Sequence, residues 1–536
     1  MSLRRAAFRA VAAGLLAAPC ARAQHPLVAL PLGDPAYVQL DALQRGGCTA
    51  ARVSPYRPFR VGLLRAALAR AAGEVRCAGP VLEYLASRFG TDTTAPAAPA
   101  SRRVTAGAAI DVRTTARRDA EFRPLWRDVR PDSLGDRAVV GIARARVTWN
   151  GGERLVAVAE GYAQSDRRND PRHRGRGFRE TSAVVDYSDA YLAGRLGPLV
   201  LGVGRTSEAW LGEGDESLVV SSHGTPLDRV SAEVRWSRFE ARAFFSTLDD
   251  VVLDARDSLP AGVPAQRVHR FLAAHALTFR PTPRWEFTLG ETALLARRGA
   301  GFELAFANPL MFYVVSENDS SHAGAFGDDN NLAAFGALRY AGGPATLQAE
   351  LLIDDIQIDA EDRENNPDKL GWRVAATLAL PLGVPASVGL EYKRVDSYTY
   401  LRDFYAQAYA LYDQPLGSEL GPDADLLRAT GEVWANGRLR VSAGVGRWRR
   451  GALRIDTRPG PRAFGHAGEP FPSVTVARPS GQTGMLGDGS VEFLDRVFPI
   501  TIRAEIARLD NVNGEPALSA TYFRAQLVGS YRFRYP

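Results

Sequence analysis

The residues best suited to binding chemistry are five tyrosines within one short stretch of the chain, residues 398–412. The five are Tyr398, Tyr400, Tyr405, Tyr409 and Tyr412. Arg402 and Asp403 lie in the same stretch. Flat aromatic rings pack against the C–H faces of sugars, while guanidinium and carboxylate groups bind paired hydroxyl groups. This combination predicts a polysaccharide-contacting surface. The alternative is that the rings form an interfacial aromatic girdle or pack inside the fold.

An arginine-rich stretch at 167–176 supplies a second candidate site. Guanidinium groups pair well with carboxylates and phosphates, which uronic acid polymers and lipopolysaccharide carry. A solvated, mobile loop is the plainer interpretation of the same charges. The arginines are Arg167, Arg168, Arg172, Arg174 and Arg176.

Two adjacent aspartates, Asp354 and Asp355, invite a glycosidase hypothesis, because paired carboxylates can act as acid and base. In a strand, however, neighbouring side chains point to opposite faces, so these two cannot flank one glycosidic bond. The acidic run continues through Asp359, Glu361 and Asp362 without a recognised calcium-loop spacing. We interpret the run as solvated charge, and we keep Asp354 and Asp355 as candidate sugar contacts.

Sequence patterns of catalysis are missing from the chain. It has no His-Glu-x-x-His, Gly-x-Ser-x-Gly or Gly-x-x-x-x-Gly-Lys pattern, and its 7 histidines are scattered without a metal-like pair. We therefore expect a protein that is not an enzyme and that uses no cofactor or metal. An outer-membrane phospholipase or protease is a minor alternative.

The elements that must position these residues are short amphipathic strands, which fill residues 103–536. Apolar and polar side chains alternate along them with a period of two, so that one face of each strand is apolar. One such strand runs from Arg229 to Trp236, and another runs from Ile500 to Ile506. Because the strands of a soluble sandwich alternate as well, the connections must decide the fold class.

The connections between the strands alternate in length. Eight are short turns, several with the glycine or asparagine of hairpins, at 150–152, 195–197, 237–238, 281–283, 342–344, 381–385, 436–437 and 496–499. Nine long polar stretches separate them, near 115–137, 164–182, 207–227, 249–267, 297–330, 357–369, 398–426, 451–485 and 510–519. This rhythm predicts an all-β transmembrane barrel of about 18 antiparallel strands, with tight turns at one rim and long loops at the other. An even strand number returns both chain ends to the same rim.

The first 23 residues have the pattern of a secretory signal peptide. A basic start is followed by an apolar stretch from Val11 to Ala18 and by Ala21-Arg22-Ala23, so the mature chain is expected to begin near Gln24. Removal of residues 1–23 lowers the formal charge from +6 to about +2. The basic composition therefore does not indicate nucleic acid as a partner.

Residues 24–102 form a second expected unit. The spacing of apolar residues and the Gly/Pro breaks predict a small periplasmic helical hairpin or bundle, and an Ala/Thr/Pro-rich linker follows at 91–102. Cys48 and Cys77 lie in this unit, and an oxidising periplasm makes a disulfide between them plausible. Neither cysteine has further ligands at the spacing of a metal site.

This layout and several short motifs resemble the capsule assembly Wzi family. The motifs are Leu43-x-x-Gly46-Gly47-Cys48, Arg57-Pro58-Phe59, Phe287-Thr288-Leu289-Gly290-Glu291, Asn308-Pro309-Leu310, Asp354-Asp355-Ile356-Gln357, and Gly417-x-x-x-Gly421 before Pro422-Asp423. The resemblance implies a surface lectin that helps retain capsular or extracellular polysaccharide at the bacterial outer membrane. Strand counting puts the tyrosine-rich stretch, Asn308, Tyr313 and the Asp354–Asp355 pair at the extracellular rim.

A conducting porin is the competing hypothesis, because a barrel of this size is wide enough for an aqueous channel. Oligosaccharide porins use the same aromatic residues and arginines. The long loop at 297–330, with Phe302, Phe306 and Phe312, can fold inward as a constriction or plug. The expected partners are surface polysaccharide, outer-membrane lipid with lipopolysaccharide, and the barrel-insertion machinery, which the aromatic last strand suits.

Overall fold

The architecture comes from a computed structural model of the whole chain. It describes residues 24–91, 103–118, 139–165, 183–212, 217–221, 225–253, 265–296, 300–313, 330–356, 368–402, 405–451, 453–456, 481–511 and 518–533. The expected signal peptide and the arginine-rich stretch at 167–176 lie outside these described residues.

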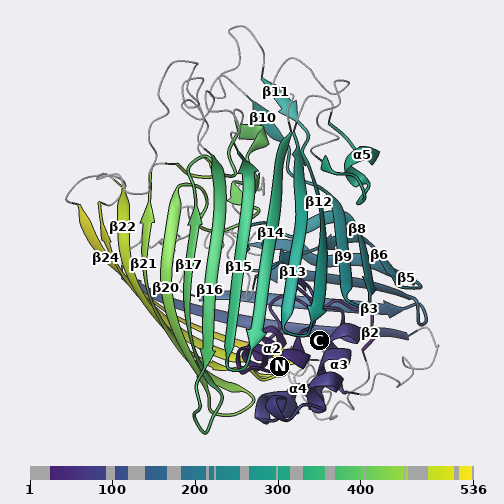
Figure 1. Cartoon of the computed structure of the whole chain (residues 1–536), viewed down its shortest axis with the longest axis vertical. Helices are drawn as coiled ribbons and strands as arrows, with labels where there is room; N and C mark the ends of the chain where they lie inside the picture. The colour runs from purple at the N-terminus through teal and green to yellow at the C-terminus, as the bar shows by residue number, and fades with distance from the viewer. Residues whose placement is uncertain are drawn as a thin grey trace, which may run out of the picture.

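Eighteen antiparallel strands close into one barrel, which confirms the fold predicted from the connections (Figure 1). In order around the wall they are β2 (Arg103–Arg118), β3 (Val139–Asn150), β4 (Leu155–Gln164), β5 (Val184–Leu196), β6 (Leu199–Thr206), β8 (Leu227–Trp236), β9 (Phe239–Thr247), β12 (Phe271–Thr282), β13 (Trp285–Leu295), β14 (Asn331–Gly342), β15 (Ala345–Asp355), β16 (Lys369–Ala379), β17 (Ala386–Val395), β20 (Ala424–Trp434), β21 (Leu439–Arg450), β22 (Gln482–Phe493), β23 (Ile500–Asp510) and β24 (Ser519–Phe533). The last strand pairs with the first, with Phe533 opposite Ala108, and this pairing closes the ring. Closure leaves no free sheet edge in the wall. A free edge would expose unpaired backbone N–H and C=O groups, which are costly in a bilayer.

The short turns gather at one end of the barrel, which we call the turn end. The long connections leave from the opposite end, which we call the loop end. All eight predicted turns join neighbouring strands of the wall. Gly197 and Gly343 each have a φ of 59°, a left-handed conformation that glycine adopts without steric cost. In another turn the side chain of Asn436 accepts the backbone N–H groups of Arg438 and Leu439, at 2.8 and 2.9 Å.

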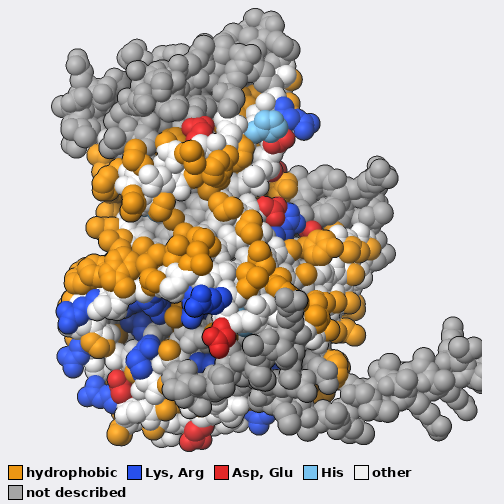
Figure 2. All heavy atoms as spheres, turned by 90° about the vertical axis from the view of Figure 1, so that its right-hand side faces the viewer, with side chains coloured by type: hydrophobic (Ala, Val, Ile, Leu, Met, Phe, Trp, Pro, Cys, Tyr) orange, Lys and Arg blue, Asp and Glu red, His pale blue; other side chains and the backbone are white. Residues whose placement is uncertain are grey.

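The two faces of the wall differ in chemistry. Side chains such as Val230, Leu289 and Val445 point outward and are exposed, whereas Arg242 and Glu350 point inward and are buried. Figure 2 shows apolar side chains as a broad band on one side of the molecule, with basic side chains gathered below it. An apolar belt around a closed barrel suits the hydrocarbon core of a bilayer. None of the helices in the described ranges is long and apolar enough to cross a membrane.

Helices occupy the N-terminal unit, as predicted. They are α2 (Ala36–Arg45), α3 (Val61–Ala72) and α4 (Pro80–Phe89). Their buried faces, which include Leu40, Leu64 and Leu85, pack on one another. A disulfide joins Cys48, after α2, to Cys77, between α3 and α4. The bond ties the three helices into one compact unit.

The helical unit also enters the turn end of the lumen, a contact that was not predicted. Its polar side chains bind the barrel at 2.5–2.8 Å. Gln39 contacts Gly437 in a turn, and three arginines contact carboxylates of the inner wall, in the pairs Arg45–Glu432, Arg52–Glu286 and Arg60–Glu233. Further in, the hydroxyl group of Tyr56 lies 2.8 Å from that of Thr278. The inward carboxylates of the wall need counter-charges, and arginines of the helical unit supply them together with arginines of the wall itself. Residues 24–91 therefore close the turn end of the barrel.

Removal of the disulfide is expected to loosen this unit without unfolding the barrel. Cys48 and Cys77 are separated by 29 residues, and a cross-link that closes a loop of this length stabilises by about 3–4 kcal/mol in the chain-entropy model. A Cys48→Ala, Cys77→Ala variant should lose hydrogen-exchange protection in α2–α4. Peptides from β14–β16 in the same sample are the control. Unchanged protection in the helices would show that packing alone holds the unit.

Candidate functional site

The loop end of the lumen is occupied by the described residues of a stretch that leaves the wall at Val395 and returns to it at Ala424, namely 396–402 and 405–423. Val395 and Ala424 pair directly across β17 and β20, so these residues form an excursion from the wall. A second stretch, with described residues 207–212 and 217–221, enters from the connection between β6 and β8. We call the described residues of these two stretches the loop-end closure.

Hydrogen bonds hold the two stretches together. The hydroxyl group of Tyr400 donates to the carbonyl oxygen of Leu218 at 2.5 Å, and that of Tyr409 donates to the carbonyl oxygen of Val219 at 3.0 Å. The backbone N–H of Leu218 donates in turn to Glu350 on the inner wall, at 3.3 Å. The loop-end closure is therefore fixed both internally and to the barrel.

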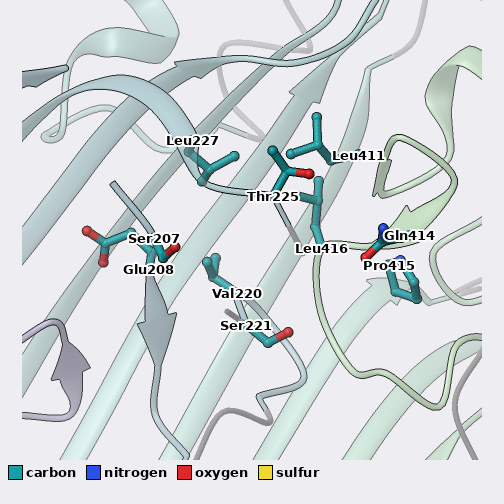
Figure 3. A pocket seen from close by; sticks show the side chains of 10 residues that line it. All are labelled: Ser207, Glu208, Val220, Ser221, Thr225, Leu227, Leu411, Gln414, Pro415 and Leu416. Atoms are coloured by element: carbon teal, nitrogen blue, oxygen red, sulfur yellow. The ribbon is translucent and has the colours of Figure 1, made fainter. Parts of the chain in front are cut away.

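Figure 3 shows the place where the two stretches meet. The side chains of Val220, Leu411 and Leu416 gather around a space of about 10 Å³, and the carboxylate of Glu208 points away from it. A space of this size holds at most about one water molecule. The closure is packed as a protein core and offers no groove for a ligand at this point.

The tyrosines predicted to contact sugar belong to this closure. Tyr398, Tyr400, Tyr405 and Tyr409 are all buried, and the rings of Tyr400 and Tyr409 stack with centroids 5.7 Å apart. Burial raises the pKa of the Tyr400 and Tyr409 hydroxyl groups above the usual value, because a phenolate would lose its hydration there. The sequence left open a sugar-contacting surface, an interfacial girdle and packing inside the fold. These four rings are packed inside the fold.

Three further predicted residues meet the closure at the loop end. Asp354, at the end of β15, is buried and accepts the backbone N–H of Tyr400 at 2.7 Å. Arg402 lies 3.5 Å from the carboxylate of Asp355 and donates to Asn331 at 3.4 Å. The side chains of Arg402 and Asp355 remain 24% and 28% exposed. This pair is reached by solvent at the loop end.

Asn308 and Tyr313 lie elsewhere, on the outer wall of the barrel. Tyr313 is buried against His275, with ring centroids 4.4 Å apart, and Asn308 is exposed next to the short helix α5 (Leu304–Ala307). The described residues 300–313 of the loop at 297–330 therefore do not form the inward constriction that the porin hypothesis allowed. These residues instead pack on outward side chains of β9 and β12.

The arginine-rich stretch lies outside the described residues. The contact of Arg167, Arg168, Arg172, Arg174 and Arg176 with anionic glycans stays a prediction. Among the described residues, no group of three His, Cys, Asp or Glu side chains is arranged to hold a metal ion.

A buried charge cluster at Glu208 was missed by the sequence reasoning. Its carboxylate, with no exposed side-chain surface, pairs with Arg229 and with Arg242, the latter at 2.6 Å. It also accepts the indole N–H of Trp210 at 2.9 Å. Glu208 lies in a connection, whereas both arginines lie in strands, so no local pattern marks the three as partners.

A polar cavity of about 260 Å³ lies deeper in the lumen. It is lined by the N-terminal stretch at 29–34 and by the inner wall, where Glu160, Tyr162 and Asp189 border it. Arg146 bridges Glu160 and Asp189 at 3.0 and 3.2 Å. The volume suits several water molecules or one small hydroxylated solute. Its lining comes from segments far apart in the chain, which is why the sequence did not reveal it.

Comparisons with known proteins agree with this architecture. The structure resembles that of Wzi, an outer-membrane protein involved in group 1 capsule assembly in Escherichia coli and a carbohydrate-binding β-barrel. The TM-score is 0.57 at 13% identity, over 94% of this chain and 99% of that one. At this identity the likeness concerns the fold alone.

Two other solved barrels have lower scores. OprD from Pseudomonas aeruginosa matches with a TM-score of 0.44 and 10% identity, over 81% of this chain and 97% of that one. OccAB4 from Acinetobacter baumannii matches with a TM-score of 0.43 and 10% identity, over 81% of this chain and 99% of that one. The comparison with curated protein sequences gives no match.

The family model described as capsule assembly protein Wzi matches residues 137–460, which is more than half of the chain. The match runs from β3 to beyond β21 and includes all of the loop-end closure. The chain belongs to the capsule assembly protein Wzi family.

Proposed function

We propose that this protein is an outer-membrane barrel that binds capsular or extracellular polysaccharide and helps to anchor it at the cell surface. The observation that carries the proposal is the occupied lumen. Residues 24–91 fill the turn end, and the loop-end closure fills the other. A barrel closed by its own chain at both ends presents a surface to a polymer instead of a path through the membrane.

The turn end faces the periplasm in this proposal, and the loop end faces the outside. Two features support this orientation. The helical unit, which would emerge first after a signal peptide, docks at the turn end. Short periplasmic turns and long outer loops are also the usual arrangement of outer-membrane barrels.

Polysaccharide contact is assigned to polar groups at the loop end, with no enzymatic step. Arg402 and Asp355 are partly exposed there and can bind sugar hydroxyl groups through a guanidinium and a carboxylate. The predicted arginines at 167–176 would add affinity for polymers that carry uronic acids. The buried tyrosines Tyr400 and Tyr409 act indirectly in this scheme, since they anchor the loop-end closure to which Arg402 belongs.

The test is binding of purified polysaccharide from the source organism to the protein in phosphatidylcholine nanodiscs. The intact protein should bind, and an Arg402→Gln variant should bind about tenfold more weakly, the loss expected for one charge-assisted hydrogen bond. The matched control is Arg284→Gln, an exposed arginine at the turn end, which should bind like the intact protein. Absence of binding by the intact protein would refute the proposal.

A further inference from the structure

The described part of the connection between β13 and β14 does not enter the lumen. Residues 300–313, which include α5, lie against the outside of the wall near the loop end (Figure 1). Phe306 and Tyr313 are buried there, and the ring of Phe302 meets that of Phe245 on β9 with centroids 5.0 Å apart. We call residues 300–313 the outer clasp.

The outer clasp covers a polar pair on the outward face of the sheet. His275 and Glu291 are direct partners across β12 and β13, and they lie on the same face as the exposed Leu277 and Leu289. A carboxylate and an imidazole on a face turned to acyl chains are costly unless they are paired and shielded. The clasp supplies a hydrogen-bond partner for the pair and also covers it.

Tyr313 provides the contact with this pair. Its backbone N–H donates to the carboxylate of Glu291 at 2.7 Å, and its ring covers His275. The imidazole Nε2 of His275 lies 3.6 Å from the same carboxylate. Phe306 packs on the Tyr313 ring with centroids 5.6 Å apart. The inner side of the clasp is therefore built to fit this place on the wall.

The outer side of the clasp is apolar and exposed. Leu304, Leu310 and Phe312 have 77%, 88% and 67% of their surface exposed. In water such a cluster would be unfavourable, because apolar surface is more stable away from water. It continues the outward apolar face of the same two strands, where Leu289 is 70% exposed. Because this surface is continuous with the lipid-facing belt, we expect it to contact lipid acyl chains as the belt does.

We propose that the outer clasp is embedded in the membrane and that its exposed side chains contact the acyl chains of the leaflet at the loop end. The clasp shields the His275–Glu291 pair on one side and meets lipid on the other. This inference rests on the membrane location in the proposed function and is independent of polysaccharide binding.

Spin labels on single cysteines test this proposal in phosphatidylcholine vesicles. A label at Leu310→Cys should be more accessible to dissolved oxygen than to a water-soluble nickel chelate, like a label at Leu289→Cys in the barrel wall. A label at Glu83→Cys, exposed on α4, is the aqueous control and should show the opposite ratio. Heat-modifiable gel mobility checks that each labelled barrel is folded.

Two results would overturn the assignment. One is a label at position 310 that matches the aqueous control, which would put the clasp in water. The other is dipolar broadening between labels at 310, which would show a second copy of the chain against this face. A Leu304→Cys label repeats the test at a second exposed position. Polysaccharide binding by the same samples is measured separately. That measurement tests the proposed function and does not depend on the position of the clasp.

Discussion

A variant that lacks the helical unit and residues 396–423 of the loop-end closure is expected to conduct ions in planar lipid bilayers, whereas the intact protein is expected to stay silent. In this variant residues 24–91 are deleted behind the signal peptide, and residues 396–423 are replaced by a short Asn-Gly turn. The turn is feasible because Val395 and Ala424 are already paired across β17 and β20. Without these two segments, only residues 207–221 of the loop-end closure remain inside an 18-stranded wall that is wide enough for an aqueous channel.

The single deletions are the controls for this experiment. Each single variant keeps either residues 24–91 or residues 396–423 in the lumen, so each should conduct far less than the double variant. Conductance by the intact protein, with block by added oligosaccharide, would favour the porin hypothesis over surface binding. A folded double variant that stays silent would show that side chains of the wall itself close the lumen.

Neutralising Glu208 is expected to destabilise the loop-end closure by about 3–5 kcal/mol, the range for removing one partner from a buried ion pair. An E208Q variant leaves Arg229 and Arg242 enclosed without the carboxylate that both of them contact. It also weakens the acceptor of the Trp210 indole N–H, which lies 2.9 Å away. Residues 207–221 should then exchange their amide hydrogens much faster, by about two orders of magnitude or more.

The matched control is Glu83→Gln, which removes an exposed carboxylate on α4 and should change stability by no more than about 0.5 kcal/mol. Urea unfolding followed by gel mobility separates an effect on the closure from an effect on the whole barrel. A difference below about 1 kcal/mol between E208Q and the intact protein would mean that the two arginines find other partners.

The barrel itself could be predicted because its signals are local. Each turn needs residues of particular backbone freedom within two to five positions, and each strand repeats with a period of two. The turns at 195–197 and 436–437 are therefore visible without any knowledge of the partner strand. The pairing of Cys48 with Cys77 was also accessible, because few cysteines remain once the expected signal peptide is removed.

The paths of the long connections could not be predicted from the sequence in the same way. Residues 300–313 and residues 396–423 are both rich in aromatic side chains. The first lie outside the wall, whereas the described residues of the second lie inside it. The difference comes from partners far away in the chain. Tyr313 meets His275 and Glu291 on the outward face, whereas Tyr400 meets Leu218 in the lumen.

The sequence by itself determined the number of strands, the end at which each connection lies and the helical unit before the barrel, since these depend on period and turn chemistry. The tertiary structure decided whether the lumen is occupied and which tyrosines are buried. Those outcomes depend on buried charges such as Glu208 and Glu286, whose partners Arg242 and Arg52 lie far away in the chain. A buried charge must find its counter-charge wherever the fold brings one near, and strand period does not encode that encounter.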